Sequence, residues 1–218
     1  MSAEFARTVP LFPLPNVVLF PRAVLPLHIF EERYKIMTAD ALDGEKLIAM
    51  ALLKPGWEKA YYSKPAIEEV VCVGKILAHE KLADGTYNFL LQGAERARVL
   101  SEIKGHPYRL AQVEPLAETP VLEIDLMNQR GRLIELFSES VWSQLPVARQ
   151  FRDLLAGPLA TAQVADLVAF NFLEDIALKQ SLLADGDIVG RVDRVIHAIQ
   201  ALQPVIAGPS RKDDPSMN

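Results

Sequence analysis

The spacing of apolar residues changes once along this chain, between Pro115 and Pro120. Before that point, short apolar runs alternate with turn residues, and Leu110–Glu114 alternates apolar with polar side chains, which is typical of β-strands. After it, apolar residues recur at spacings of four and three, the period of an amphipathic α-helix. In the last such helix they are Ile188, Val192, Val195, Ile199 and Leu202. The change predicts an α+β chain with a β-rich unit at 1–118, a helical unit at 119–205 and a disordered tail at 206–218.

Turn and proline signals divide the first unit into strands. Asp84–Gly85 separates the apolar runs Ile76–Leu82 and Thr86–Leu91, which predicts a β-hairpin. Val9–Pro15 is apolar but interrupted by prolines, so we expect an edge strand or loop there, because proline cannot donate to a strand ladder. A helical stripe beginning at Phe30 should end at Gly44. Further strands are predicted at Leu25–Phe30, Leu47–Leu53, Val70–Ala78, Ala94–Val99 and Leu110–Glu114.

Composition limits the class of protein and its partners. Half of the 218 residues are hydrophobic and 23% are charged, which is typical of a folded globular chain. The longest apolar run, Leu47–Leu53, has seven residues and is too short to span a bilayer. A net charge of −5 lacks the basic excess of nucleic-acid binders, and the N-terminus has no secretory signal pattern. We expect a cytoplasmic protein without nucleic-acid or membrane partners, possible homo-oligomerisation being left open.

The sequence contains no pattern that predicts a catalytic or metal site. The four histidines have no HxxxH or HxH spacing, and neither a nucleophile elbow nor a phosphate-binding glycine loop occurs. Cys72 is the only cysteine and lies in an apolar strand segment, so we interpret it as a small buried hydrophobe. The adjacent acidic pairs, such as Glu68–Glu69, are interpreted as solvated surface. We therefore expect no catalytic residue, no metal, no cofactor and no enzymatic activity.

Aromatic residues in one loop are candidate binding anchors. Trp57, Tyr61 and Tyr62 lie in Lys54–Pro65, a segment bounded by proline and glycine. Loops are mostly on the surface, where aromatic groups often bind partners; the alternative is that these rings fold back as a small satellite cluster. Arg96 and Arg98 should share one strand face, which we interpret as solvated.

A series of motifs in fixed order resembles the N-terminal LON substrate-binding domain of Lon proteases, which also occurs as a free-standing bacterial protein. The resemblance covers about residues 8–203, with Arg22 in place of a frequent glycine and Glu32 in place of a frequent proline. The motifs are Pro13–Pro21, Leu25–Glu31, Arg33–Tyr34, Leu53–Glu58, Val73–Ile76, Asp84–Tyr87, Leu90–Gly93, Arg96–Arg98, Pro107–Tyr108, Ala165–Leu167 and Lys179–Leu183.

The resemblance implies a PUA-like, partly open β-barrel domain followed by an α-helical bundle domain. It also implies a non-catalytic module that binds unfolded or extended polypeptide, or a protein partner, because neither a Walker A motif nor a Ser-Lys protease domain is present. The candidate peptide-binding residues are Phe20, Leu25, Trp57, Tyr61 and Tyr62. The family-motif residues expected to be structural are Pro15, Phe20, Pro21, Pro26, His28, Phe30, Glu31, Arg33, Tyr34, Gly85 and Gly93.

Two alternatives to polypeptide binding remain. One is a cryptic hydrolase or peptidase whose residues converge only in the folded chain. The other is an RNA-binding module, which rests on analogy with other PUA-like barrels alone.

Overall fold

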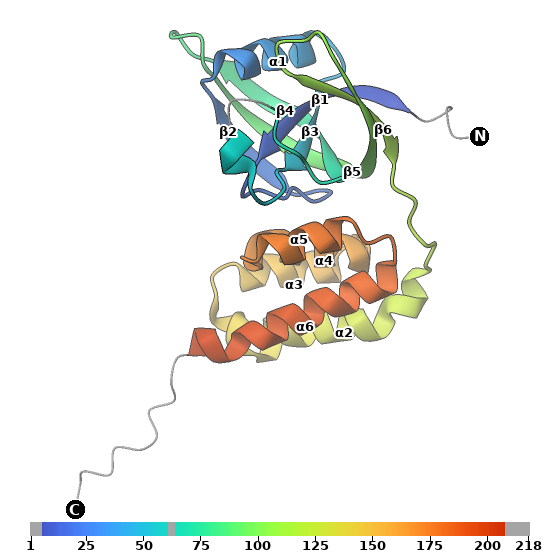
Figure 1. Ribbon diagram of the computed structural model, residues 1–218. Helices are drawn as coiled ribbons and strands as arrows, with labels where there is room; N and C mark the ends of the chain where they lie inside the picture. Colours follow the sequence, from blue (N-terminus) through green and yellow to red (C-terminus); the bar gives the residue numbers. More distant parts are fainter. Residues whose placement is uncertain (1–5, 61–63, 208–218) are drawn as a thin grey trace, which may run out of the picture.

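The computed structural model describes residues 6–60 and 64–207, which form a β lobe and a helical lobe (Figure 1). The strands are β1 (Arg7–Leu14), β2 (Val24–Ile29), β3 (Leu47–Leu52), β4 (Val70–Lys81), β5 (Tyr87–Ile103) and β6 (Arg109–Pro115). The α-helices are α1 (Glu32–Asp43), α2 (Met127–Glu139), α3 (Ala148–Ala156), α4 (Thr161–Phe172), α5 (Ile176–Leu183) and α6 (Ile188–Ala207). Short 3-10 helices are η1 (Trp57–Ala60), η2 (Glu123–Leu126) and η3 (Val141–Gln144).

The β lobe is a barrel-like sheet that is partly open. Its strand order is β2-β5-β4-β3-β1-β6, and β6 also pairs with β5. The long strand β5 makes this arrangement possible, because Tyr87–Gln92 pairs with β2 and Ala97–Ile103 pairs with β6. Strand β2 therefore continues the sheet on one half of β5 without joining the barrel. The predicted α+β class with a partly open barrel is confirmed.

Small side chains fill one core of the β lobe. Members of this core come from β1, β3, β4, β5 and β6, and a barrel of so few strands has room inside only for small residues. The residues are Val9, Leu11, Ala49, Ala51, Val71, Val73, Ala97, Ala111 and Val113. The alternate strand residues Phe12, Met50 and Cys72 join a larger core that includes α1 and the helical lobe. Cys72 is fully buried, and burial raises the pKa of its thiol, which agrees with its interpretation as a buried hydrophobe.

Strand β1 lies inside the sheet, so the expectation of an edge strand or loop at Val9–Pro15 is wrong. It pairs in parallel with β3 over Leu11–Leu14 and antiparallel with β6 over Arg7–Leu11. The two pairings overlap only at Leu11. Pro10 therefore pairs only with β6, and Pro13 pairs only with β3. The N–H group that each proline lacks can then lie on the side of β1 where no strand pairs.

The predicted hairpin is confirmed, but its second strand is longer than expected. Gly85 has a φ of +83°, as a tight turn requires, and β4 and β5 pair on both sides of it. The strands expected at Thr86–Leu91 and Ala94–Val99 form one strand, β5, which passes through Gly93. A Cβ at Gly93 would lie 2.0 Å from the carbonyl oxygen of Phe20, so glycine allows the 20–23 turn to pack directly on β5.

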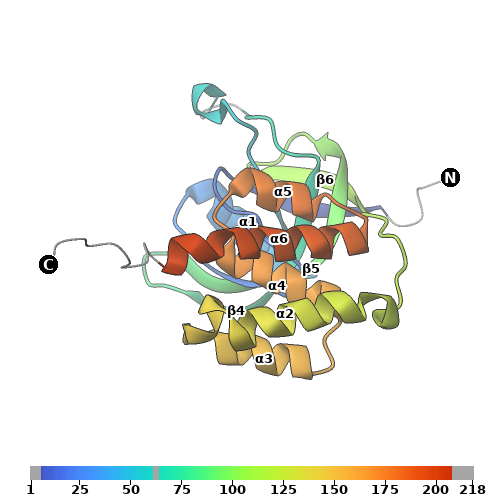
Figure 2. The same ribbon diagram turned by 90° about the horizontal axis from the view of Figure 1, so that it is seen from below.

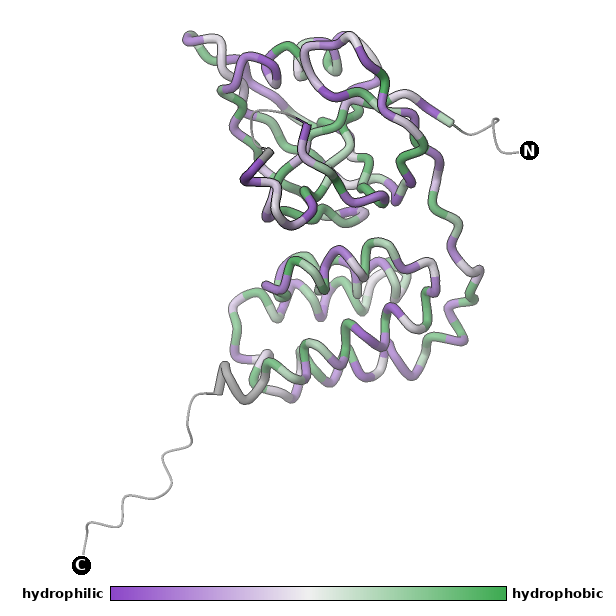
Figure 3. The backbone as a smooth tube through the Cα atoms, in the orientation of Figure 1, coloured by the Kyte–Doolittle hydropathy of each residue, from purple (hydrophilic) through white to green (hydrophobic). Residues whose placement is uncertain are grey.

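An aromatic cluster fills the helical lobe, whose helices present mixed hydrophobic and hydrophilic residues along their length (Figure 3). Phe137 of α2 stacks on Phe151 of α3 at 4.9 Å between ring centroids, and Phe172 lies 5.1 Å from Phe151. Trp142 meets Phe172 edge-on at 5.1 Å.

Within the described residues, no helix is both long enough and apolar enough to cross a membrane. Helix α6 continues past Pro204 to Ala207.

Buried charges join the two lobes. Arg96 of β5 is only 5% exposed, so the interpretation of this residue as solvated is wrong, whereas Arg98 is exposed. The Nη2 of Arg96 lies 2.6 Å from Oδ1 of the buried Asp166 on α4. Arg191 of α6 lies 3.4 Å from the same oxygen and 2.7 Å from Oε1 of Glu118 in the connection between lobes. We call Arg96, Glu118, Asp166 and Arg191 the lobe clamp.

Asp166→Ala should lower the free energy of unfolding by about 3–5 kcal/mol, because it leaves two buried guanidinium groups short of a carboxylate. Urea unfolding at neutral pH measures the loss. The matched control is Asp193→Ala, which breaks the half-exposed pair of Asp193 with Arg132 and should cost no more than about 1 kcal/mol. Equal losses for the two variants would contradict the role of the lobe clamp.

Tyr108, just before β6, ties helix α1 to the barrel. Its hydroxyl donates a hydrogen bond to Oδ2 of Asp40, at 2.8 Å. Burial, together with this bond and the Asp40 charge, raises the pKa of Tyr108 to about 12. The unfolded chain loses this proton near pH 10, so ionisation favours unfolding between about pH 10 and pH 12.

The free energy of unfolding should therefore fall as pH rises through this window, and Tyr108→Phe should make the fall shallower. Other groups titrate in both proteins, so the difference between the two unfolding curves isolates Tyr108. Chemical unfolding from pH 9 to pH 12 provides the measurement. Parallel curves for wild type and variant would contradict the prediction.

Candidate functional site

A cleft of about 400 Å³ lies in the β lobe where four distant segments meet. The end of β1, the start of α1, the loop that contains η1 and the residues before β6 form its walls. Several prolines and aromatic residues line it, and aromatic walls are common in ligand pockets. We call it the Trp57 cleft; its main wall residues are Pro13, Pro15, Tyr34, Trp57, Pro107 and Tyr108.

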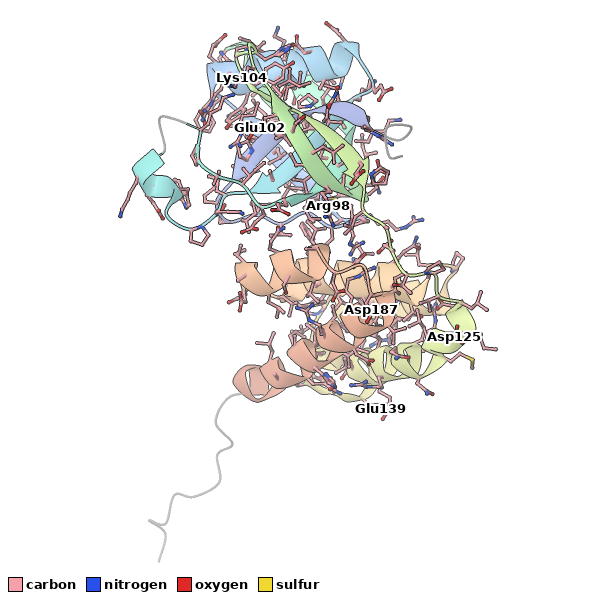
Figure 4. All side chains as sticks on the ribbon, turned by 45° about the vertical axis from the view of Figure 1, so that its right-hand side comes forward. Arg98, Glu102, Lys104, Asp125, Glu139 and Asp187 are labelled. Atoms are coloured by element: carbon pink, nitrogen blue, oxygen red, sulfur yellow. The ribbon has the colours of Figure 1, made fainter. Side chains whose placement is uncertain are left out.

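Two arginines of the Trp57 cleft are already paired within the protein. Arg33 lies 2.9 Å from Oε2 of Glu31, and its guanidinium carbon is 4.5 Å from the centre of the Tyr34 ring. Arg109 forms an ion pair with Glu102, which Figure 4 places on β5. These contacts pair both guanidinium groups, and apolar surface prevails in the walls. Lys64 also lines the cleft and forms no ion pair with another described residue.

The loop that carries Trp57 is anchored at its base. The N–H of Lys54 donates to the carbonyl of Ala66 at 2.8 Å, and Leu53 forms a β-bridge with Ile67. Arg109 Nη1 donates to the carbonyl of Pro65 at 2.7 Å. Beyond this base, η1 projects from the body of the molecule (Figures 2 and 4). Trp57 lies between the anchored base of the loop and the projecting residues of η1.

A second cleft, of about 620 Å³, lies between the β lobe and helix α5. Trp57 also lines this cleft, so one indole side chain borders both cavities. The other walls include Pro15 and Glu68 from the β lobe and Ile176 from α5. Gln180 of α5 fixes the helix against the barrel by donating to the carbonyl of Val70 at 2.9 Å. We call this cavity the inter-lobe cleft.

The candidate peptide-binding residues differ in burial and in their distance from the two clefts. Trp57 is half-buried and lies at both clefts. Phe20 is 0% exposed and belongs to the core, so the prediction that it binds peptide is corrected: its side chain is buried, and its backbone packs on Gly93. Leu25 is half-buried on β2 and lines neither cleft. Tyr61 and Tyr62 lie outside the described residues.

The family-motif residues fall into three groups. Pro15, Glu31, Arg33 and Tyr34 gather at the Trp57 cleft although the sequence predicted only structural roles for them. Core and turn positions are taken by Phe20, Pro21, Gly85 and Gly93. The remaining motif residues, Pro26, His28 and Phe30, lie on or next to β2.

The outward face of β2 is a third candidate surface. Pro26, His28 and Leu90 border a shallow hollow of about 460 Å³. Phe30 is 66% exposed and stacks on the His28 ring at 6.2 Å between centroids. An exposed aromatic group beside apolar strand residues is a common feature of protein-binding surfaces, so this face has to be distinguished from the Trp57 cleft by experiment.

Sequence reasoning missed several residues of the two clefts. Tyr108 belongs to a quoted motif but was given no role, and its place in the wall follows from its bond to Asp40. Glu68 and Glu69 were interpreted as ordinary solvated surface, yet both line the inter-lobe cleft. Their position directly after the Lys54–Pro65 loop was the available signal.

The described residues do not gather the groups that metal chemistry requires. No cluster of three or more histidine, cysteine, aspartate or glutamate side chains that could hold a metal ion occurs in 6–60 and 64–207. The two clefts instead combine apolar walls with a few polar groups, an arrangement suited to binding.

Curated relatives share the sequence over most of this chain. Lon protease from Dictyoglomus thermophilum is 28% identical over 201 residues, which are 90% of this chain and 24% of that protein. Lon protease 2 from Bdellovibrio bacteriovorus is 27% identical over 225 residues, or 98% of this chain and 27% of that protein. The chain thus spans about a quarter of the length of these relatives.

Solved structures share the fold. The N-terminal domain of a Mycobacterium avium complex Lon protease superposes with a TM-score of 0.68 at 16% identity, covering 89% of this chain and 98% of that one. A Lon N-terminal domain protein from Xanthomonas campestris gives 0.60 at 22% identity, covering 91% and 99%. The family model of the substrate-binding domain of ATP-dependent protease La (LON) matches residues 8–201. This chain therefore belongs to the LON substrate-binding domain family.

Proposed function

We propose that this chain is a non-catalytic module that binds extended polypeptide at the Trp57 cleft, in the cytoplasm. The observation that carries the proposal is the position of Trp57, which borders both an apolar cleft in the β lobe and the cleft between the lobes. A chain lying across the indole would reach both cavities. Family membership supports a polypeptide as the ligand, because the family is defined by substrate binding.

The walls of the Trp57 cleft suit apolar side chains better than charged ones. Prolines are rigid and Tyr34 is packed on Phe12 at 4.6 Å between rings, so this surface loses little conformational freedom when a ligand binds. The internal pairing of Arg33 and Arg109 limits the cost of covering these charges. A tryptophan in such a setting is the residue type most often found as a binding hot spot.

Addition of a further strand at β2 is a less favourable mode of binding. β2 stands at the end of the sheet order, where its outer edge pairs with no described strand. Pro26 lies in the middle of this strand, and a proline on an edge strand hinders further strand pairing. Side-chain insertion into a cleft therefore accounts for polypeptide binding better than strand addition does.

Trp57→Ala should weaken the binding of a fluorescently labelled, apolar 12-residue peptide by at least about 30-fold, the effect of losing a hot spot of about 2 kcal/mol. Fluorescence anisotropy titration gives the dissociation constant. The matched control is Phe30→Ala, which removes an exposed aromatic ring outside the cleft and should change the affinity less than threefold.

The reverse order of effects would place the binding surface on β2 instead of the Trp57 cleft. Thermal unfolding of both variants checks that neither substitution acts through loss of the fold. No measurable binding of apolar peptides to the wild-type chain would contradict the proposed function.

A further inference from the structure

The inter-lobe cleft differs from the Trp57 cleft in its charge. Two acidic residues, Glu68 and Glu69, line it together with one basic residue, Lys54. None of the three forms an ion pair with another described residue, in contrast to the paired Arg33 and Arg109 of the neighbouring cleft. The cleft therefore presents excess negative charge that the described part of the chain does not neutralise.

The two glutamates stand in a fixed segment of the fold. The N–H of Glu68 donates to the carbonyl of Leu52 at 2.8 Å, and the carbonyl of Glu69 accepts from Val99 at the same distance. Strand β4 begins at the next residue. Their backbone is thus held in place, and Glu68 is half-buried, so a ligand would meet this charge without first ordering a loop.

The remaining walls suit a cation with an apolar neighbour. Trp57 lines the same cleft, and the face of an indole ring attracts ammonium and guanidinium groups. Pro15 and Ile176 supply apolar surface on the two lobes. A lysine or arginine side chain has an apolar stem and a charged end, which matches this combination of walls.

We propose that the inter-lobe cleft receives a lysine or arginine side chain of the bound polypeptide, so that the protein selects extended apolar segments that carry a basic residue. The proposal rests on polypeptide binding at Trp57 and adds the substrate class. The apolar part of the segment occupies the Trp57 cleft, while its basic residue lies between Trp57 and the carboxylates of Glu68 and Glu69.

The attraction of basic peptides by the net negative charge of the whole protein has to be distinguished from their binding at the inter-lobe cleft. The whole chain carries a net charge of −5, and long-range attraction of this kind acts on any cationic peptide. The control must remove equal charge far from the cleft. Glu135 and Glu139 are exposed on α2 and form no ion pair within the described residues, and Figure 4 shows Glu139 on the side of the helical lobe away from the barrel.

The experiment compares three labelled 12-residue peptides that are identical except for one central residue, which is lysine, glutamine or glutamate. Anisotropy titrations give the dissociation constants at 50 mM and 500 mM NaCl. Wild type should bind the lysine peptide about 3- to 10-fold tighter than the glutamine peptide, as expected for one or two solvent-exposed charge pairs. The glutamate peptide should bind weakest, and the preference should shrink at high salt.

The double variant Glu68→Gln/Glu69→Gln should abolish the lysine preference, so that its dissociation constants for the lysine and glutamine peptides become equal. The control Glu135→Gln/Glu139→Gln should keep most of the preference although it has the same net charge. Lys54→Gln should increase the preference, because it removes the cation that competes within the cleft. Thermal unfolding verifies that all variants are folded.

Equal affinity of wild type for the lysine and glutamine peptides would overturn the proposal and leave polypeptide binding intact. Equal loss of the preference in the two double variants would also overturn it, because the attraction would then be general. Failure of all three peptides to bind would instead contradict the proposed function itself.

Discussion

The contact between the two lobes depends on a buried set of opposite charges. Asp166 accepts from Arg96 and lies near Arg191, and both arginines also approach Glu118. Such a cluster is stable only when every charge keeps a partner, because an isolated buried charge is costly. It draws on β5, on the connection between the lobes and on two helices, so it fixes their relative position. The inter-lobe cleft exists because the lobes are held at this spacing.

Strand β5 links this clamp to the barrel. One half of the strand pairs with β2 and the other with β6, while β4 runs along its opposite side. Gly93 lies between the two halves and lets the backbone of Phe20 approach. Arg96 follows three residues later and points to the helical lobe. A single strand therefore shapes the opening of the barrel and holds the helices against it.

The two clefts that share Trp57 have different roles in the proposed mode of binding. In the Trp57 cleft, arginines are paired with neighbouring carboxylates, and the walls are mostly apolar. In the inter-lobe cleft, carboxylates are left without ion-pair partners among the described residues. In the proposed mode of binding, the first would favour affinity for apolar chain through burial, and the second would supply selectivity through charge.

Much of the fold could be predicted from local sequence patterns. The order of a β lobe and a helical lobe follows from apolar periodicity, and the β4–β5 hairpin follows from Asp84–Gly85, because both depend on residues close together in the chain. The proline-rich β1 could not be placed, since its position inside the sheet depends on which strand lies beside each proline. The candidate site was predicted only in part, through Trp57 and through motif residues whose gathering at one cleft was not foreseen.

The sequence by itself determined the family, the α+β class and the burial of Cys72, because motif order and short-range periodicity are properties of the linear chain. Only the tertiary structure decided that Phe20 is core, that Arg96 is buried and that Glu68 and Glu69 line a cleft. Arg96 and Asp166 are 70 residues apart in sequence. Whether a charged side chain is solvated or paired depends on which distant residue the folded chain brings beside it, and no local pattern records that.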